Sequence, residues 1–514
     1  MDFTRRQLLY AGGGLGTAAL LAACGDGGGA APAAGGSPRQ GGTLRIGALG
    51  RTSAITRDPH GTQGNESDYL VIALVYDTLT APGGKGNNTV ARLASAFTPS
   101  KDLKTWRFTL AEGTAFHDGT PVAADDVVWS LRRLRDTPSG AARLPGIAAA
   151  HITADGKRTV VLVSDYANAE LPLLTRLSTF VLKKDTPDKE IPGAPGTGPF
   201  KLDWYRGGNA RLLRNGHWHG GAVHLDAIEV TMFQSPQAMT NAMLSGQIDV
   251  ASNAGAVAAR TARARRDIQV VRRPDDMAMP VVMRTSDGPF ADARVREAIK
   301  LLVDREAMVR QVLSGYGSVA NDILGTGDPA YTKDIPQRGR DLAKAKRLLT
   351  DAGFDFSRTY QLVTTEDVAG LAESATLFAS QAREAGVKIE VVKQESGAFY
   401  QKTWLKGDFY TNYWGTNDSV VFFASKTLTT GAGQNEADWS DKEFDAAYRK
   451  VLATADRTAR AAALRDLQRI EHDRSGYLLW GMADGIDLAA PKVRGLPKLP
   501  GYGRVQLENV WLAP

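Results

Sequence analysis

Only one cysteine, Cys24, occurs in this chain of 514 residues. A single cysteine excludes an intramolecular disulfide and a cysteine-rich metal site, so hydrophobic cores and secondary structure have to hold the fold together. At roughly 150 residues per domain, the length corresponds to about three structural units, which is enough for several cores and for a cleft between them. The sequence therefore predicts a multi-lobed globular protein.

The residues before Cys24 have the pattern of an export leader. Arg5 and Arg6 precede a run of small and apolar residues that is too short and too rich in glycine for a bilayer span of ~20 strongly apolar residues. The arginine pair resembles a twin-arginine export signal, and Leu21-Ala22-Ala23-Cys24 resembles the lipobox of bacterial lipoproteins. We expect a signal peptide over residues 1–23 and lipidation of Cys24; the alternative is an ordinary buried cysteine.

Residues 24–40 consist mostly of Gly, Ala, Pro and Ser. Such a composition cannot bury enough apolar surface to fold. We expect this segment to be a flexible tether that holds the folded body above the outer face of the membrane.

The charge of the chain does not indicate a nucleic-acid partner. There are 62 Lys and Arg against 56 Asp and Glu, and the resulting net charge of +6 is spread over the whole sequence. No segment concentrates basic residues as a nucleic-acid surface does.

Apolar periodicity predicts a mixed α/β body. Alternation predicts strands over residues 41–49, 106–110, 159–163 and 228–233, and helical spacing predicts a helix ending near Leu79 and another with Pro121 in its first turn. From about Asp292 helices and strands alternate, with three Asp residues placed as helix N-caps and Gly353 placed to end a helix. The N-cap candidates are Asp292, Asp304 and Asp341.

Five short blocks, in this order, resemble the family 5 or cluster C extracellular solute-binding proteins of dipeptide, oligopeptide and nickel ABC importers. They are Gly41 to Arg45; Tyr76 to Leu79; Thr105 to Leu110 with Phe116 to Gly119 and Asp125 to Val127; Gly196 to Phe200; and Pro289 to Ile299. Each block alone is a weak signal, whereas five in the expected order are a specific one.

The resemblance implies an α/β, two-lobed periplasmic-binding-protein-like fold of cluster C, type II, with an extra subdomain inserted in lobe I. Lobe I is expected to comprise residues 41–75, 194–267 and 490–514, the inserted subdomain residues 76–193, and lobe II residues 268–489. A ligand that contacts both lobes only in the closed state shifts the population toward that state.

The resemblance also indicates where a ligand would bind. In peptide-binding relatives, a strand of lobe II ends in a Trp, and an Asp three residues later pairs with the ligand's α-ammonium. Here the strand is residues 409–414, ending in Trp414, and the matching position is Asn417, whose amide cannot supply the full charge pairing. Asp418 could substitute by a one-residue shift, or it could cap the turn or helix that follows.

Three further residues are candidates for ligand contact. Tyr410, Asn412 and Trp414 share one face by strand alternation, so Tyr410 and Trp414 could form a pocket wall or pack in a core. Trp439 is a nearby aromatic candidate with the same alternative. Arg284 stands where the family usually has Asn, and could grip a carboxylate or be an ordinary exposed residue.

No motif argues for catalysis or for a cofactor. His217, His219 and His224 are close enough in sequence to suggest a metal cluster, but they fall where the family has a loop, so we expect no metal site. The familiar hydrolase, metalloprotease and phosphate-loop motifs do not occur.

Together with the leader pattern, the resemblance implies a lipid-anchored, extracytoplasmic, monomeric receptor, not an enzyme, that delivers a peptide or peptide-like ligand to the transmembrane subunits of an ABC permease. The alternatives are a sugar, a siderophore or a nickel chelate in the same role, or a surface hydrolase or chaperone-like lipoprotein.

Overall fold

The computed structural model describes residues 37–61, 65–83, 88–137, 140, 143–176, 179–328, 330–366, 368–415, 419–499 and 504–514. The chain divides into Met1–Ser37 and a compact unit over Pro38–Pro514. The predicted signal peptide, Cys24 and most of the tether lie outside the described residues, and all that follows concerns the second unit.

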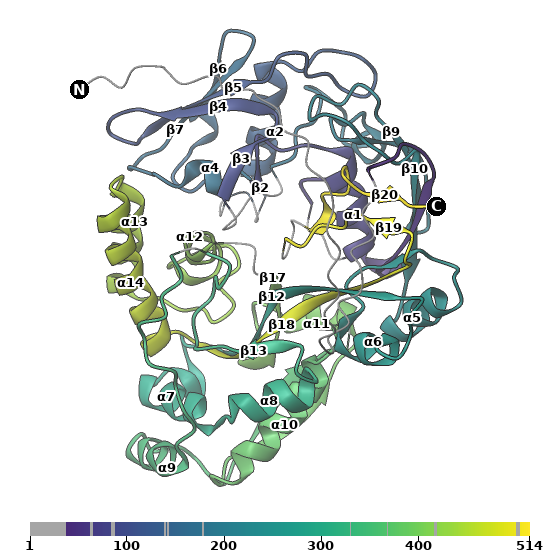
Figure 1. Cartoon of the computed structure of the whole chain (residues 1–514). Helices are drawn as coiled ribbons and strands as arrows, with labels where there is room; N and C mark the ends of the chain where they lie inside the picture. The colour runs from purple at the N-terminus through teal and green to yellow at the C-terminus, as the bar shows by residue number, and fades with distance from the viewer. Residues whose placement is uncertain are drawn as a thin grey trace, which may run out of the picture. The chain divides into compact units, whose positions relative to one another are not determined.

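A twelve-stranded mixed sheet runs through this unit (Figure 1). Its order is β15-β14-β16-β12-β18-β11-β1-β10-β9-β8, while β13 also pairs with β18 and β17 with β12. The strands are β1 (Thr43–Leu49), β8 (Phe200–Arg206), β9 (Asn209–Arg214), β10 (Ala227–Phe233), β11 (Val250–Ala251), β12 (Gln269–Met283), β13 (Gly317–Val319), β14 (Thr359–Thr364), β15 (Lys388–Lys393), β16 (Phe409–Thr411), β17 (Trp414–Gly415) and β18 (Tyr477–Ala489).

Two long antiparallel strands, β12 and β18, join the two ends of this sheet. Their pairing extends from Gln269 opposite Ala489 to Val282 opposite Tyr477, with bulges after Arg273 and after Met279. The strands β1 and β8 to β11 lie on one side of this pair, and β14 to β16 lie on the other. A bulge bends a strand, so these two strands can serve both parts of the sheet.

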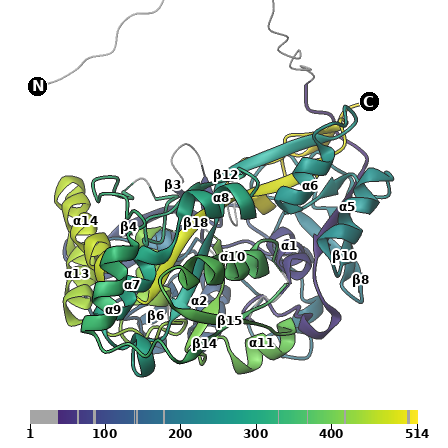
Figure 2. The ribbon, with the colours of Figure 1, turned by 90° about the horizontal axis from the view of Figure 1, so that it is seen from below.

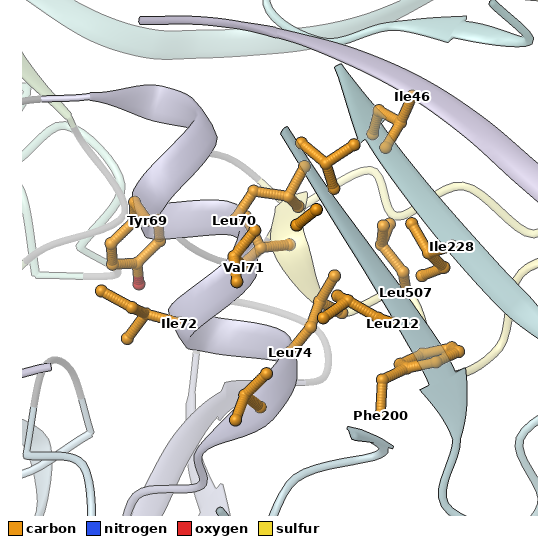
Figure 3. Close-up of a cluster of buried hydrophobic side chains, with 14 of the residues drawn as sticks. Ile46, Tyr69, Leu70, Val71, Ile72, Leu74, Phe200, Leu212, Ile228 and Leu507 are labelled. Carbon is orange, nitrogen blue, oxygen red and sulfur yellow. The ribbon is translucent and has the colours of Figure 1, made fainter. Parts of the chain in front are cut away.

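The sheet around β1 packs on helix α1 (Glu66–Val75), whose side chains are buried almost all round (Figure 3). Leu70 and Leu74 of α1 lie in one cluster with Ile46, Leu212 and Phe200 of the strands. A helix that is apolar on all faces needs cover on all faces, which the C-terminal residue Leu507 helps to provide.

Helices α7 (Ala293–Leu302), α8 (Arg305–Val312), α9 (Leu342–Asp351) and α10 (Leu371–Arg383) pack on the other part of the sheet (Figures 1 and 2). The predicted caps are confirmed: Asp292, Asp304 and Asp341 accept hydrogen bonds from backbone N–H groups in the first turns of α7, α8 and α9. Gly353 has φ +69° just after α9, as a C-terminal glycine requires.

A separate four-stranded sheet, in the order β4-β5-β7-β6, packs on α2 (Ala124–Arg135). Its strands are β4 (Ala94–Pro99), β5 (Thr105–Leu110), β6 (Ile152–Asp155) and β7 (Thr159–Val163).

The other elements are η1 (Thr52–Ala54), β2 (Thr80–Gly83), β3 (Asn88–Ala91), η2 (Ala149–His151), α4 (Leu171–Leu174), η3 (Ile191–Gly193), α5 (Pro236–Leu244), α6 (Gly255–Ala262), η4 (Gly288–Phe290), α11 (Ser396–Lys402), α12 (Val420–Phe423), η5 (Ala424–Leu428, a π-helical turn), α13 (Lys442–Ala453), α14 (Arg457–Arg474), β19 (Val493–Arg494) and β20 (Trp511–Leu512).

Three local predictions are wrong in detail. Pro121 is not in the first turn of a helix: α2 begins at Ala124, and Pro121 forms an isolated bridge with Ala115. Helix α1 ends at Val75 and not near Leu79, because Tyr76 already has extended backbone. The single strand expected over residues 409–414 is two short strands, β16 and β17, which pair with separate stretches of β12.

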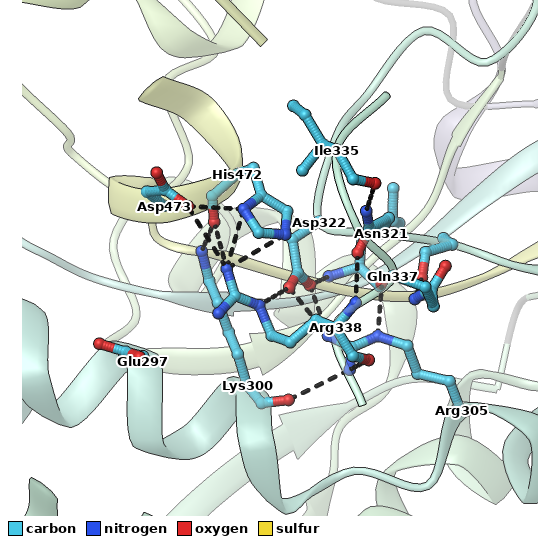
Figure 4. Close-up of polar contacts among 12 residues, drawn as sticks. Glu297, Lys300, Arg305, Asn321, Asp322, Ile335, Gln337, Arg338, His472 and Asp473 are labelled. Carbon is cyan, nitrogen blue, oxygen red and sulfur yellow. Dashed lines mark hydrogen bonds and ion pairs between the residues drawn. The ribbon is translucent and has the colours of Figure 1, made fainter. Parts of the chain in front are cut away.

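A buried ionic network ties α7, α8 and α14 to the loop before α9 (Figure 4). The carboxylate of Asp322 accepts hydrogen bonds from Arg305 and from Arg338, each at 2.8 Å, and from the backbone N–H of Leu479 at 2.9 Å. Lys300, fully buried beside these groups, donates to the carbonyl of His472 at 3.1 Å. Burial lowers the pKa of Lys300 to about 7, against the attraction of Asp322.

Among the described residues, no helix combines the length and the apolar content needed to cross a bilayer.

Candidate ligand-binding site

The buried carboxylate of Glu436 is the polar centre of the region in which the sequence places the ligand. It accepts hydrogen bonds from the indole N–H groups of Trp404 and Trp414, each at 2.8 Å, and from the hydroxyl of Tyr477 at 3.0 Å. Asn412 donates a fourth, short bond, and the hydroxyl of Tyr410 donates to the backbone carbonyl of Glu436 at 3.2 Å. We call Trp404, Tyr410, Asn412, Trp414, Glu436 and Tyr477 the Glu436 cluster.

The sheet positions most of this cluster. Tyr410 belongs to β16, Trp414 to β17, and both strands pair with β12, which also pairs with β18 and hence with Tyr477. Tyr410, Asn412 and Trp414 all reach Glu436, so the shared face predicted from strand alternation is confirmed despite the break between the two strands.

Burial dominates the electrostatics of the cluster. Burial raises the pKa of Glu436 to about 7, although the hydrogen bonds from Trp414, Tyr477, Asn412 and Trp404 favour the ionised form. Burial and then the charge of Glu436 raise the pKa of Tyr410 and of Tyr477 well above the ordinary value, so both hydroxyls remain donors at neutral pH.

Two cations lie against the aromatic rings next to this cluster. The ammonium of Lys426 is 4.3 Å from the ring centroid of Trp414 and 5.2 Å from that of Phe422. The guanidinium of Arg143 is 4.6 Å from the centroid of the same Phe422 ring. Both side chains are buried, and cation–π contacts strengthen when the cation is desolvated.

The segment that carries Arg143 also contacts helices α13 and α14. The backbone N–H of Ala169 donates to the carbonyl of Leu452 at 2.8 Å, and Glu170 forms an ion pair with Arg460 at 2.9 Å. Leu174 shares a hydrophobic cluster with Trp414 and Phe422. Burial raises the pKa of Glu170, and Arg460 opposes that rise. Arg143 and residues 169–174 therefore pack against the elements around Trp414.

The other two predicted contact residues lie in ordinary surroundings. Arg284, just after β12, forms ion pairs with Asp438 at 2.7 Å and Asp287 at 3.3 Å, both partners being exposed. Trp439 is buried, with its ring centroid 4.9 Å from that of Phe444. Trp439 has the core contacts stated as its alternative, whereas Arg284 is half-buried and not an ordinary exposed residue; ligand contact stays a prediction for each.

Asn417 and Asp418, the two candidates for an ammonium partner, lie outside the described residues. The helix that follows them, α12, has Ser419 as its N-cap, and the Ser419 hydroxyl accepts from the N–H of Phe422 at 3.0 Å.

The histidine-rich segment shows contacts of a structural kind. The His219 imidazole lies 3.2 Å from the carbonyl of Arg92, and Trp218 next to it donates to Asp77 at 2.9 Å. Across the residues that the structure describes, no group of three or more His, Cys, Asp or Glu side chains is placed to hold a metal ion.

Two recesses lie elsewhere. One, of about 430 Å³, is lined by Val312, Glu373 and Thr376 among others; a smaller one, of about 10 Å³, is lined by Val71, Ile72 and Tyr205 among others. Neither is lined by a residue of the Glu436 cluster.

The sequence prediction omits Glu436, Lys426 and Arg143. Glu436 lies in a polar stretch, Gln434-Asn435-Glu436-Ala437-Asp438, in which nothing distinguishes a buried acid from exposed ones. Lys426 has a local signal in the sequence, because it follows the apolar run Val420-Val421-Phe422-Phe423-Ala424 after one intervening residue. A lysine that follows such a run can bury its alkyl stem, but the position of its ammonium over two aromatic rings depends on the fold.

Comparisons with known proteins agree with the geometry. The family described as bacterial extracellular solute-binding proteins, family 5 (Middle) matches residues 88–436, which is more than half of the chain. The chain is 25% identical to the probable D,D-dipeptide-binding periplasmic protein DdpA of Escherichia coli K12, over 82% of this chain and 85% of that protein. It is 24% identical to the nickel-binding periplasmic protein of the same organism, over 85% of this chain and 89% of that protein.

Solved structures show the same fold. A dipeptide-binding protein from Pseudoalteromonas sp. SM9913 in complex with Met-Leu has a TM-score of 0.81 and 22% identity, covering 92% of this chain and 100% of that chain. AgaA from A. tumefaciens R10, in complex with agropinic acid, has the same TM-score and identity, covering 92% and 99%. The fold is thus the two-lobed α/β type II periplasmic-binding-protein fold. The chain belongs to the bacterial extracellular solute-binding proteins of family 5, which are binding proteins of ABC importers and not enzymes.

Proposed function

We propose that this protein captures a peptide or peptide-like ligand between two lobes that close on it, and delivers the ligand to the permease of an ABC importer. In this proposal Trp414 contributes to the wall of the site, and Asn417 or Asp418 faces the amino end of the ligand. The protein acts as a monomer outside the cytoplasm, and a lipid on Cys24 holds it at the membrane.

The observation that carries this proposal is the set of contacts across the predicted lobe boundary near Trp414. Arg143, Ala169 and Glu170 belong to the predicted inserted subdomain, and they contact Phe422, Leu452 and Arg460 of predicted lobe II. Contacts of this kind form only when the two parts are together, so they are available to stabilise a closed, ligand-bound state.

The similarity to peptide-binding relatives supports the choice of ligand class. Relatives named for dipeptides or for di- and tripeptides match over more than four fifths of this chain. A nickel-binding protein matches equally well, so a nickel chelate is the second candidate. A chelate or a sugar would be favoured if Arg284 and Asn417 both lined the site. The ion pairs of Arg284 with Asp287 and Asp438 do not support this arrangement.

The test is to identify the ligand directly. The protein is purified without denaturation, heated to release bound compounds, and the released fraction is analysed by mass spectrometry. In parallel, thermal unfolding is followed in the presence of synthetic di- to hexapeptides, oligosaccharides and nickel–histidine. A true ligand at 100 times its dissociation constant stabilises the fold by about 2.7 kcal/mol. Stabilisation by an oligosaccharide or by nickel–histidine alone would reject the peptide assignment.

A further inference from the structure

Four hydrogen-bond donors converge on the single carboxylate of Glu436. Trp404 and Asn412 donate to one oxygen, and Trp414 and Tyr477 donate to the other. An ionised carboxylate has about four acceptor positions, so these partners satisfy it completely. The side chain has no exposed surface, and losing one partner would leave a buried polar group unsatisfied.

Other side chains fit this position poorly. Both indole N–H groups are donors only, so they cannot accept from an added proton or from an amide NH₂ group. Gln at position 436 would direct its NH₂ group at one of two pairs of donors, either Trp404 with Asn412 or Trp414 with Tyr477. Only an ionised carboxylate accepts from all four donors at once, so the contrast with Gln is complete only above the pKa of Glu436, which is about 7, and binding is to be measured at about pH 8.

The hydrogen bond that Trp414 donates to Glu436 also fixes the orientation of Trp414. The indole N–H points at Glu436, the ammonium of Lys426 lies over the ring face, and the Phe423 ring stands at 74° to it, 6.4 Å away. The bond from Asn412 holds the same stretch of chain two residues earlier. These contacts at the edge and over the face of the indole ring restrict the Trp414 side chain to one rotamer before a ligand binds.

We propose that Glu436 is a positioning residue of the ligand site: by accepting the indole N–H bond it holds Trp414 in the orientation that contacts the ligand. The inference rests on the proposed function, because it takes Trp414 as part of the wall. It adds a residue that does not touch the ligand and yet sets the affinity, since a wall fixed in advance costs less entropy on binding.

The experiment measures binding of the tightest-binding member of a synthetic di- to hexapeptide pool by isothermal titration calorimetry. Glu436→Gln should weaken binding by about tenfold, the factor expected when a charge-assisted hydrogen bond no longer fixes the wall. Trp414→Phe, which keeps a ring but removes the N–H, should weaken binding comparably. The double variant should have about the same dissociation constant as the single variant that binds the peptide less tightly, because both changes break the same hydrogen bond.

Glu471→Gln is the matched control. Glu471 is also a buried acid whose pKa burial raises, to about 8, but it accepts from the backbone N–H of Leu324 and not from Trp414. Gln keeps an oxygen that can accept this bond, so the variant should fold and leave the dissociation constant of the peptide unchanged. If Glu436→Gln does not fold, Trp414→Phe alone decides: unchanged affinity of that variant overturns the inference.

The possible failures are distinguishable. If no peptide binds the wild-type protein, the proposed function is wrong and the inference is wrong with it. If a peptide binds the wild type and Glu436→Gln with equal affinity, or if the effects of the two substitutions multiply fully, the function stands and the positioning role is wrong.

Discussion

Replacing Asp322 by Asn should destabilise the protein strongly, because Asp322 is the anion of a buried network with several cations. Its carboxylate binds Arg305 and Arg338, and Lys300 lies beside them. Although burial opposes it, the charges of Arg305, Lys300 and Arg338 lower the pKa of Asp322. Asn keeps the shape but removes the charge, which leaves the buried guanidinium of Arg305 without its anion and the half-buried Arg338 with only the more distant Asp473, at 3.9 Å.

The expected loss is about 3–5 kcal/mol, the range for breaking one partner of a buried ion pair. At an unfolding entropy of about 2 cal/mol/K per residue, a chain of this size would lose roughly 3–5 °C of unfolding temperature. Urea unfolding followed by circular dichroism, at one temperature and pH 7, measures the free energy directly. A second variant, Asp322→Asn with Arg338→Gln, should recover part of the loss, because it removes one of the unbalanced cations.

The control is an exposed ion pair on α8. Glu306 and Arg310 lie 3.3 Å apart with side chains 78% and 64% exposed, so Glu306→Gln should cost less than about 0.5 kcal/mol. A loss below 1 kcal/mol for Asp322→Asn would refute the reasoning, since the network would then contribute no more than a surface pair.

Three further predictions concern other parts of the chain. Burial lowers the pKa of His60 to about 4, and the neutral ring suits the fold because Arg133 donates to its Nδ1 at 3.1 Å. The unfolded protein binds a proton at His60 more readily than the folded one, so the free energy of unfolding should fall as the pH falls from 6.5 through 4. In urea unfolding at a series of pH values, the His60→Gln variant should lose about 3 kcal/mol less than the wild type over this range. Gly196→Ala would place a Cβ 1.9 Å from the carbonyl oxygen of Val75, so it should lower the unfolding free energy by at least about 1–3 kcal/mol, whereas Gly193→Ala, with open space around it, should not. Cys24→Ser should move the protein from the membrane to the soluble fraction in cell fractionation; continued membrane retention would contradict the lipid anchor.

Local signals explain why the helix caps could be predicted from the sequence. Asp292, Asp304 and Asp341 each accept a bond from an N–H group only two or three residues later. Such a bond depends on adjacent residues alone, so the sequence contains all that is needed.

The two strands that join the sheet lack such a signal. Strand β18 is buried along its whole length but includes Gly481, Asp484 and Asp487. These carboxylates are satisfied by Arg272 and Arg273 of β12, more than 200 residues earlier in the sequence. Alternation of apolar and polar residues cannot reveal a strand whose polar residues are buried with a distant partner.

The candidate site shows the same limit. Trp414 and Tyr410 were recognisable from a family resemblance and from strand alternation, whereas their common partner Glu436 was not. Its donors range from Trp404 to Tyr477 in sequence, and only the folded sheet brings them together.

The most direct test of the central claim, that a ligand closes the two lobes, is a distance measurement between them. Spin labels are placed at Glu112→Cys in the predicted inserted subdomain and Glu306→Cys in predicted lobe II, both highly exposed, in a Cys24→Ser background. The distances are then measured by double electron–electron resonance. Saturating peptide should convert a broad or longer distribution into a single, narrow, shorter one. An identical distribution with and without bound peptide would contradict closure.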